Sequence, residues 1–76
     1  MRLKTKNEIR SKVRLLYGLT YVLREHIDDL RVDARNPDID QLYALVRETN
    51  ETLERIIDIL ADIEYTIFLE TNKGSH

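Results

Sequence analysis

Cysteine is absent from this 76-residue sequence, and it has only two glycines and one proline. Without cysteine the chain forms no disulfide, no thiolate metal site and no cysteine nucleophile. The scarcity of glycine and proline leaves few residues for the tight turns of a β-rich fold. We therefore expect one small all-α domain. The missing cysteines suit a reducing compartment, and we expect the protein in the cytoplasm.

Long apolar runs are missing as well. No stretch approaches the roughly eighteen uncharged apolar residues of a membrane helix, so no membrane contact is expected. The N-terminal MRLKTKNEIR lacks the apolar core of a secretion signal. At the other end, residues 74–76 (Gly, Ser, His) resemble a linker that leads into a purification tag. The expected domain therefore covers residues 1–73.

The sequence does contain two stretches whose apolar residues recur at alternating steps of three and four. This coiled-coil spacing places them on one face of an α-helix and suits a second helix packed alongside. We call the two sets together the predicted seam. In the first stretch it comprises Ile9, Val13, Leu16, Thr20, Leu23, Ile27 and Leu30. In the second it comprises Ile39, Leu42, Val46, Thr49, Leu53, Ile56, Leu60, Ile63 and Ile67.

The ends of the first helix are marked by local signals. Thr5 and Glu8 have the spacing of a capping box, in which each side chain bonds a backbone N–H at the helix start. Pro37 cannot continue a helix, because its ring disfavours the helical conformation of the preceding residue. The first helix is therefore predicted over about residues 6–34.

The second helix is predicted to follow at once. A turn over residues 35–37 makes Asn36 a good N-cap and Pro37 a good first helical residue. The helix then runs over about residues 37–71. So short a connection between two long helices predicts an antiparallel helical hairpin.

Two places leave alternatives open. The polar stretch at residues 48–52 could break the second helix and give three helices, although the predicted seam keeps its phase across it. Gly18 lies inside the first helix. It is either a tolerated surface glycine or the mark of a close approach between helices.

The net charge of −2 hides a strong asymmetry along the chain. Residues 1–14 carry six lysines and arginines against Glu8, whereas residues 48–76 carry seven acids against Arg55 and Lys73. A hairpin folded about residue 36 pairs positions whose numbers sum to about 72, which makes the two blocks neighbours and favours the antiparallel arrangement. The residues expected to lie alongside one another are Arg10, Lys12 and Arg14, and Asp58, Asp62 and Glu64.

More apolar side chains are present than two helices can cover. Beside the predicted seam, further apolar residues form a second stripe on each helix, and exposed stripes of this size mark interaction surfaces. A symmetric dimer that forms a four-helix bundle covers them. The expected contacts between subunits are Leu15, Leu19, Val22, Ile57, Ile59 and Phe68.

No residues have the spacing of a catalytic or cofactor site, so we expect neither an enzyme nor a bound cofactor or metal. His26, the only histidine outside the expected tag, is interpreted as an interface or surface residue. Carboxylates at steps of three or four on the second helix could bind magnesium, but a solvated, charge-paired face is the expected interpretation. These carboxylates are Glu51, Glu54, Asp58 and Asp62.

Two functions of different classes follow. The favoured one is a small protein–protein interaction module, a regulator, adaptor or inhibitor, that acts as a homodimeric bundle and binds a further protein. The alternative is a nucleic-acid-binding regulator in which Arg10, Lys12 and Arg14 contact phosphates. In shape alone, the predicted dimeric hairpin resembles the plasmid RNA-binding regulator Rop, and this resemblance implies nucleic-acid binding by a helix face.

Overall fold

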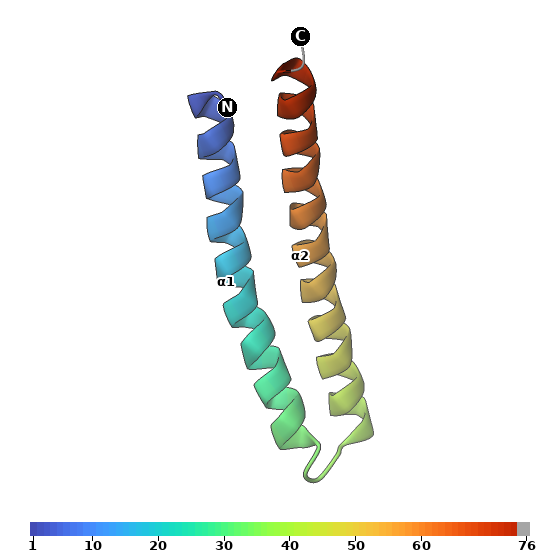
Figure 1. Ribbon diagram of the computed structural model, residues 1–76. Coiled ribbons are helices and arrows are strands. Elements are labelled where there is room, and N and C mark those ends of the chain that lie inside the picture. Colours follow the sequence, from blue (N-terminus) through green and yellow to red (C-terminus); the bar gives the residue numbers. More distant parts are fainter. Residues whose placement is uncertain (75–76) are drawn as a thin grey trace.

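The computed structural model describes residues 1–74 of the chain, with the side chains of residues 1–72. Helix α1 (Leu3–Asp33) and helix α2 (Ile39–Gly74) are its two elements, and the described residues include no strand. The helices run side by side in opposite directions, with both termini at one end and the turn at the other (Figure 1). The predicted all-α helical hairpin is confirmed. The part of the tag prediction that concerns residues 75–76 lies outside the described residues.

Helix α1 begins earlier than predicted, and the expected capping box is wrong. Arg2 is the N-cap residue, and its side chain makes no capping hydrogen bond. Thr5 lies inside the helix, where its hydroxyl donates to Oε2 of Glu70 at 3.1 Å. The backbone N–H of Arg2 donates to Oε1 of the same carboxylate at 3.1 Å. A side chain from α2 therefore satisfies the start of α1, in place of Glu8.

The turn is longer than predicted. Asp38, not Asn36, caps α2, because its Oδ1 accepts from the backbone N–H groups of Asp40 at 3.0 Å and Gln41 at 3.3 Å. Pro37 precedes this cap, so its predicted place as the first helical residue is also wrong. The connection occupies residues 34–38, and α2 begins two residues later than predicted.

Helix α2 continues without a break through the polar stretch at residues 48–52, so a single second helix is confirmed. The hydroxyl of Thr49 donates to the carbonyl of Leu45 at 2.7 Å, and that of Thr52 to the carbonyl of Glu48 at 3.1 Å. Both hydroxyls are satisfied within their own helix, so both threonines can be buried without an unpaired polar group.

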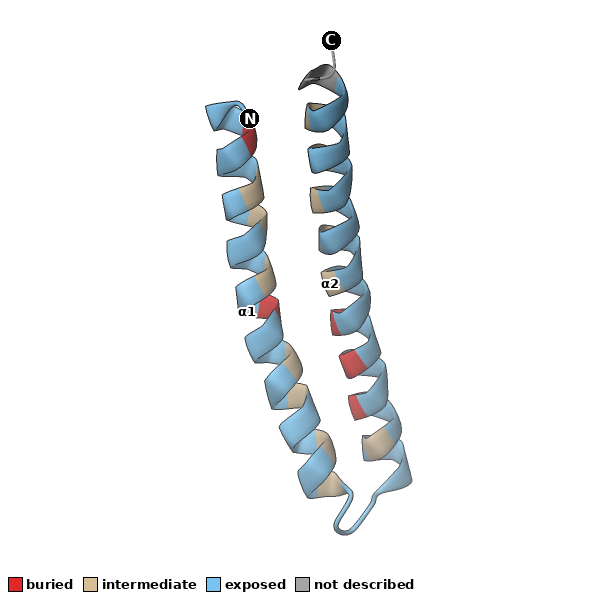
Figure 2. Cartoon of the chain, in the orientation of Figure 1, coloured by how far each residue is buried: buried red, intermediate tan, exposed pale blue. Residues whose placement is uncertain are grey.

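Buried and half-buried residues line the facing sides of the two helices (Figure 2). We call this set the hairpin seam, and all other residues from 1 to 72 are exposed. On α1 it comprises Thr5, Ile9, Lys12, Leu16, Leu19, Leu23, His26, Leu30 and Asp33. On α2 it comprises Leu42, Leu45, Thr49, Thr52, Ile56, Ile59, Ile63, Thr66 and Glu70.

Only every second position of the predicted seam lies in the hairpin seam. The shared positions are Ile9, Leu16, Leu23, Leu30, Leu42, Thr49, Ile56 and Ile63. The others were predicted wrongly, since they are exposed: Val13, Thr20, Ile27, Ile39, Val46, Leu53, Leu60 and Ile67. Except at Ile39, the residue one position earlier in the chain lies in the hairpin seam instead, at Lys12, Leu19, His26, Leu45, Thr52, Ile59 and Thr66.

The register of the hairpin accounts for this difference. The numbers of contacting residues centre on about 75 rather than 72. They sum to 72 for Arg2 and Glu70, 74 for Lys12 and Asp62, 74 for His26 and Glu48, 75 for Thr5 and Glu70, and 78 for Lys12 and Thr66. Each residue of α2 thus lies opposite a residue about three positions further along α1 than predicted, although the connection at residues 34–38 is still centred on residue 36. Three positions in each heptad are able to face a partner helix, and a seam between two helices uses two of them. Two alternative seams therefore exist, and the register of the hairpin selects between them.

Candidate interaction surface

The exposed half of the predicted seam forms one side of the hairpin. Apart from Ile39, each of these residues follows a hairpin-seam position by one residue, a rotation of about 100° around its helix. Because the helices are antiparallel, the same rotation in both leads to the same side of the molecule. We call this side the apolar flank, and its members are Val13, Thr20, Ile27, Val46, Leu53, Leu60 and Ile67.

The aliphatic side chains of the apolar flank are about half exposed, from 39 % for Leu53 to 51 % for Ile27 and Leu60. The opposite side of the hairpin, which we call the mixed flank, has a different chemistry. Each of its members precedes a hairpin-seam position, and polar or charged residues interrupt the aliphatic ones: Glu8, Leu15, Val22, Asp29, Gln41, Glu48, Arg55, Asp62 and Leu69. Only the apolar flank is a continuous apolar strip.

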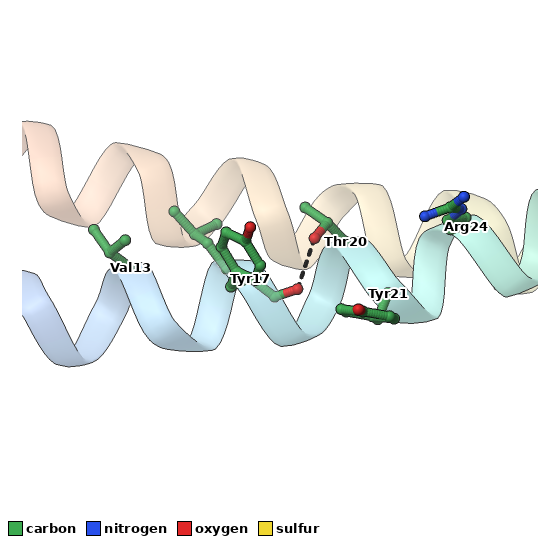
Figure 3. A pocket seen from close by; sticks show the side chains of 6 residues that line it. Val13, Tyr17, Thr20, Tyr21 and Arg24 are labelled. Atoms are coloured by element: carbon green, nitrogen blue, oxygen red, sulfur yellow. Dashed lines mark hydrogen bonds between the residues drawn. The ribbon is translucent and has the colours of Figure 1, made fainter.

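Two shallow grooves border the apolar flank. The groove on α1, drawn in Figure 3, is lined by Val13, Leu16, Tyr17, Thr20, Tyr21 and Arg24. The Thr20 hydroxyl donates to the carbonyl of Tyr17 at 2.6 Å, so it needs no partner from outside the helix. The groove on α2 is lined by Tyr43, Val46, Arg47, Asn50, Glu51 and Glu54. The α1 groove therefore carries a cation at one end, and the α2 groove carries carboxylates.

The six residues predicted to join two subunits do not share one face. Leu19 is 6 % exposed and Ile59 is half-buried, so both belong to the hairpin seam. Leu15 and Val22 lie on the mixed flank. Ile57, 61 % exposed, lies next to the apolar flank, and Phe68, 58 % exposed, lies on the outer side of α2. Their role between subunits stays a prediction. In the structure these six residues are spread over several sides of the hairpin, so they do not form a single contact surface.

Sequence reasoning assigned the apolar flank to the inside of the hairpin and therefore missed it as an outer surface. The signal was present, because the flank positions are almost all aliphatic. The alternative seam positions Lys12, His26 and Thr52 are polar. Apolar periodicity alone therefore favours the face that the structure leaves exposed.

The predicted nucleic-acid contacts are also divided. Lys12 turns towards α2, where its Nζ lies 2.8 Å from Oδ2 of Asp62 and 3.5 Å from the hydroxyl of Thr66. This ion pair confirms that the basic block of α1 meets the acidic block of α2 at this point. Arg10 and Arg14 are exposed and form no ion pair with any residue that the structure describes.

His26 lies in the hairpin seam, with Nδ1 3.8 Å from Oε2 of Glu48. The carboxylates of α2 are occupied in part by cations, since Asp62 pairs with Lys12 and Glu51 with Arg47. Within residues 1–72, no three histidine, aspartate or glutamate side chains gather closely enough to hold a metal ion.

Gly18 has open space around it: apart from its two chain neighbours and the backbone of its own helical turns, no heavy atom lies within 4 Å of the position that a Cβ would occupy. Of the two interpretations, the surface glycine is therefore confirmed within the single chain. It lies away from both the hairpin seam and the apolar flank.

Glu70 joins the two chain ends electrostatically. The hydrogen bond from the Arg2 backbone N–H is the main cause that lowers the pKa of Glu70, helped by the Thr5 hydroxyl and the Arg2 guanidinium. Partial desolvation acts in the opposite direction but does not prevail. The ionised carboxylate is thus the form that holds the two ends together.

Comparisons with protein-family models, curated proteins and solved structures return no match to this chain. Neither helix, over its described length, combines the length and apolar character needed to cross a membrane. The apolar flank and its two grooves are the surface features from which a function can be inferred.

Proposed function

We propose that this chain is a non-enzymatic protein–protein interaction module, a small regulator, adaptor or inhibitor. It works as a homodimeric four-helix bundle assembled through the apolar flank. The exposed apolar surface of the single chain supports the dimer. A further protein partner and the cellular location stay predictions from the sequence.

The main support is the amount of surface that one chain leaves exposed. The hairpin measures 60 × 16 × 12 Å and exposes 6295 Å². A compact monomer of 9.0 kDa exposes only about 4,900 Å². The excess is on the order of 1,000 Å² for each chain, and two such faces together give the roughly 2,000 Å² or more typical of a stable homodimer interface.

The apolar flank is the face best suited to bury this excess. On each helix, the positions common to the predicted seam and the hairpin seam, such as Leu16 and Ile56, lie between the other hairpin-seam positions and the apolar flank. The apolar flank is therefore continuous with the hairpin seam. A helix in a four-helix bundle uses three positions of each heptad to contact the other helices. Stacking two hairpins flank to flank encloses the shared positions at the centre of the bundle.

Light scattering on a size-exclusion column tests the proposal. The expected mass is 18 kDa, twice the 9.0 kDa chain. Replacing Leu53 and Leu60 by aspartate should give a monomer, because each charge would be buried without a partner. The matched control carries aspartate at Leu15 and Val22 on the mixed flank, and it should remain a dimer.

Circular dichroism must show helix in both variants for the comparison to hold. If the Leu53 and Leu60 variant unfolds, replacement of the same pair by serine is the milder test. A monomeric wild-type chain would refute the dimer. A control that becomes monomeric while the flank variant stays dimeric would return the interface to Leu15 and Val22.

One observation favours nucleic-acid binding as a second candidate. On the side of α1 next to the apolar flank, exposed Tyr17 and Tyr21 lie among cations, and aromatic rings between cations suit single-stranded nucleic acid. The cations are Lys6, Arg10, Arg14 and Arg24. Replacing Arg10 and Arg14 by alanine should then abolish a salt-sensitive complex with RNA while the helical fold persists. Added RNA that leaves the elution of the wild type unchanged would reject this candidate.

A further inference from the structure

Resting on the proposed dimer, we infer that the two copies stack with both turns at the same end. Helix α1 of each copy then lies against α2 of the other. A two-fold axis allows only two ways to stack the flanks face to face. An axis along the helices gives this arrangement, whereas an axis across them puts the turns at opposite ends and sets α1 against α1.

Charge distinguishes the two arrangements. The side of α1 next to the apolar flank is strongly basic, with Asp28 as its one acid. Its cations are Lys6, Arg10, Arg14, Arg24 and Arg31. The matching side of α2 carries Arg47 with the acids Asp40, Glu54 and Glu64. Setting α1 against α1 brings cations together, whereas setting α1 against α2 brings them to carboxylates.

The grooves agree with the same arrangement. An axis along the helices keeps every residue at its own height, and within the hairpin residues at one height have numbers that sum to about 75. Ile57, one of the most exposed aliphatic side chains, then arrives at the height of residue 18 on the other copy. That height lies between Tyr17 and Tyr21, where the α1 groove is open.

The α2 groove receives a matching pair of side chains. In the stacked dimer, Arg24 and Ile27 of the second copy lie level with residues 51 and 48 of the first copy. There Arg24 meets Glu54, together with Glu51, which Arg47 of the same groove already pairs at 3.7 Å. Ile27 meets the apolar wall of the groove at Val46. Each groove is thus filled by a side chain of suitable chemistry, and both contacts occur twice by symmetry.

Spin labels measure the arrangement directly, because the chain has no native cysteine. The Asn36→Cys variant places a label on the exposed turn. With the turns together, the distance between two labels is short, about 20–30 Å from helix diameters and label lengths. With the turns apart, it approaches the 60 Å length of the hairpin.

A label at Gly18, replaced by cysteine, is the matched control. Residue 18 lies near the middle of α1, so its distance to the second copy is short in both arrangements. A short distance at Gly18 with a long one at Asn36 would overturn the inference and leave the proposed dimer intact. A chain that is monomeric by light scattering would overturn both.

A charge exchange gives an independent test. In the inferred arrangement, Arg10 meets Glu64 of the second copy, and within one chain the two form no ion pair. Arg10→Glu and Glu64→Arg should each weaken dimerisation about tenfold, and the double variant should recover most of the loss. Losses that simply add in the double variant would contradict the contact.

Discussion

The hairpin seam and the apolar flank differ in an instructive way. The seam is buried, yet it contains Lys12, His26 and Asp33, whereas the exposed flank is aliphatic except at Thr20. Burial of apolar surface is the main favourable term in folding, so a free hairpin leaves much of it unused. The proposed dimer accounts for this contrast, because in it one hairpin is half of a larger core.

The largest effect is expected inside the hairpin seam. Leu19→Ala should lower the free energy of unfolding by about 2–5 kcal/mol, because it removes a side chain that is only 6 % exposed and leaves a cavity. Chemical denaturation measures the change. Leu15→Ala, on the mixed flank and 49 % exposed, should cost less than about 1 kcal/mol. Equal costs would remove the distinction between seam and surface.

An intermediate effect that depends on protein concentration is expected on the apolar flank. Leu53 is 39 % exposed in one chain, so its truncation to alanine should cost about 1 kcal/mol in a monomer. In the proposed dimer the cost should rise to about 2–3 kcal/mol, as for a core residue. Thermal unfolding over a hundredfold range of concentration separates the two cases. A concentration-independent loss would place the flank outside any interface.

Outside both surfaces, the expected change is smaller and of opposite sign. Gly18→Ala should stabilise the hairpin by about 1 kcal/mol, because glycine is a poor helix former and the added methyl group meets open space. Thermal or chemical unfolding measures the gain. Destabilisation would show that another chain approaches α1 closely at this position.

The smallest effect concerns the end of the hairpin seam. The pKa of folded Glu70 is lowered, so its carboxylate stabilises the hairpin above its ordinary value near 4.5. That contribution disappears as the pH falls through the lowered pKa. Glu70→Gln should therefore melt below the wild type at neutral pH, and the gap should close in acid. Glu25→Gln, at an exposed site outside the hairpin seam and both flanks, is the control, and a gap at Glu70 that does not depend on pH would contradict the ionic role.

Periodicity and proline, which are properties of the sequence, were sufficient to predict two long helices, their antiparallel pairing and the continuity of α2. They also predicted the shared seam positions such as Leu16 and Ile56 and the meeting of Lys12 with Asp62. These features depend on residues close in the chain, or on the direction in which the helices run. Local chemistry therefore determines them.

Only the tertiary structure decided which apolar row is buried and which is exposed. Asp38 caps α2 in place of Asn36, and the helices pair in a register about three residues away from the predicted one, so Leu19 enters the hairpin seam while Val13 and Leu53 stay on the flank. At the open end, Glu70 from α2 caps α1 across the full length of the chain. Each heptad permits two seams, and contacts between distant residues choose one of them. No local pattern contains that choice.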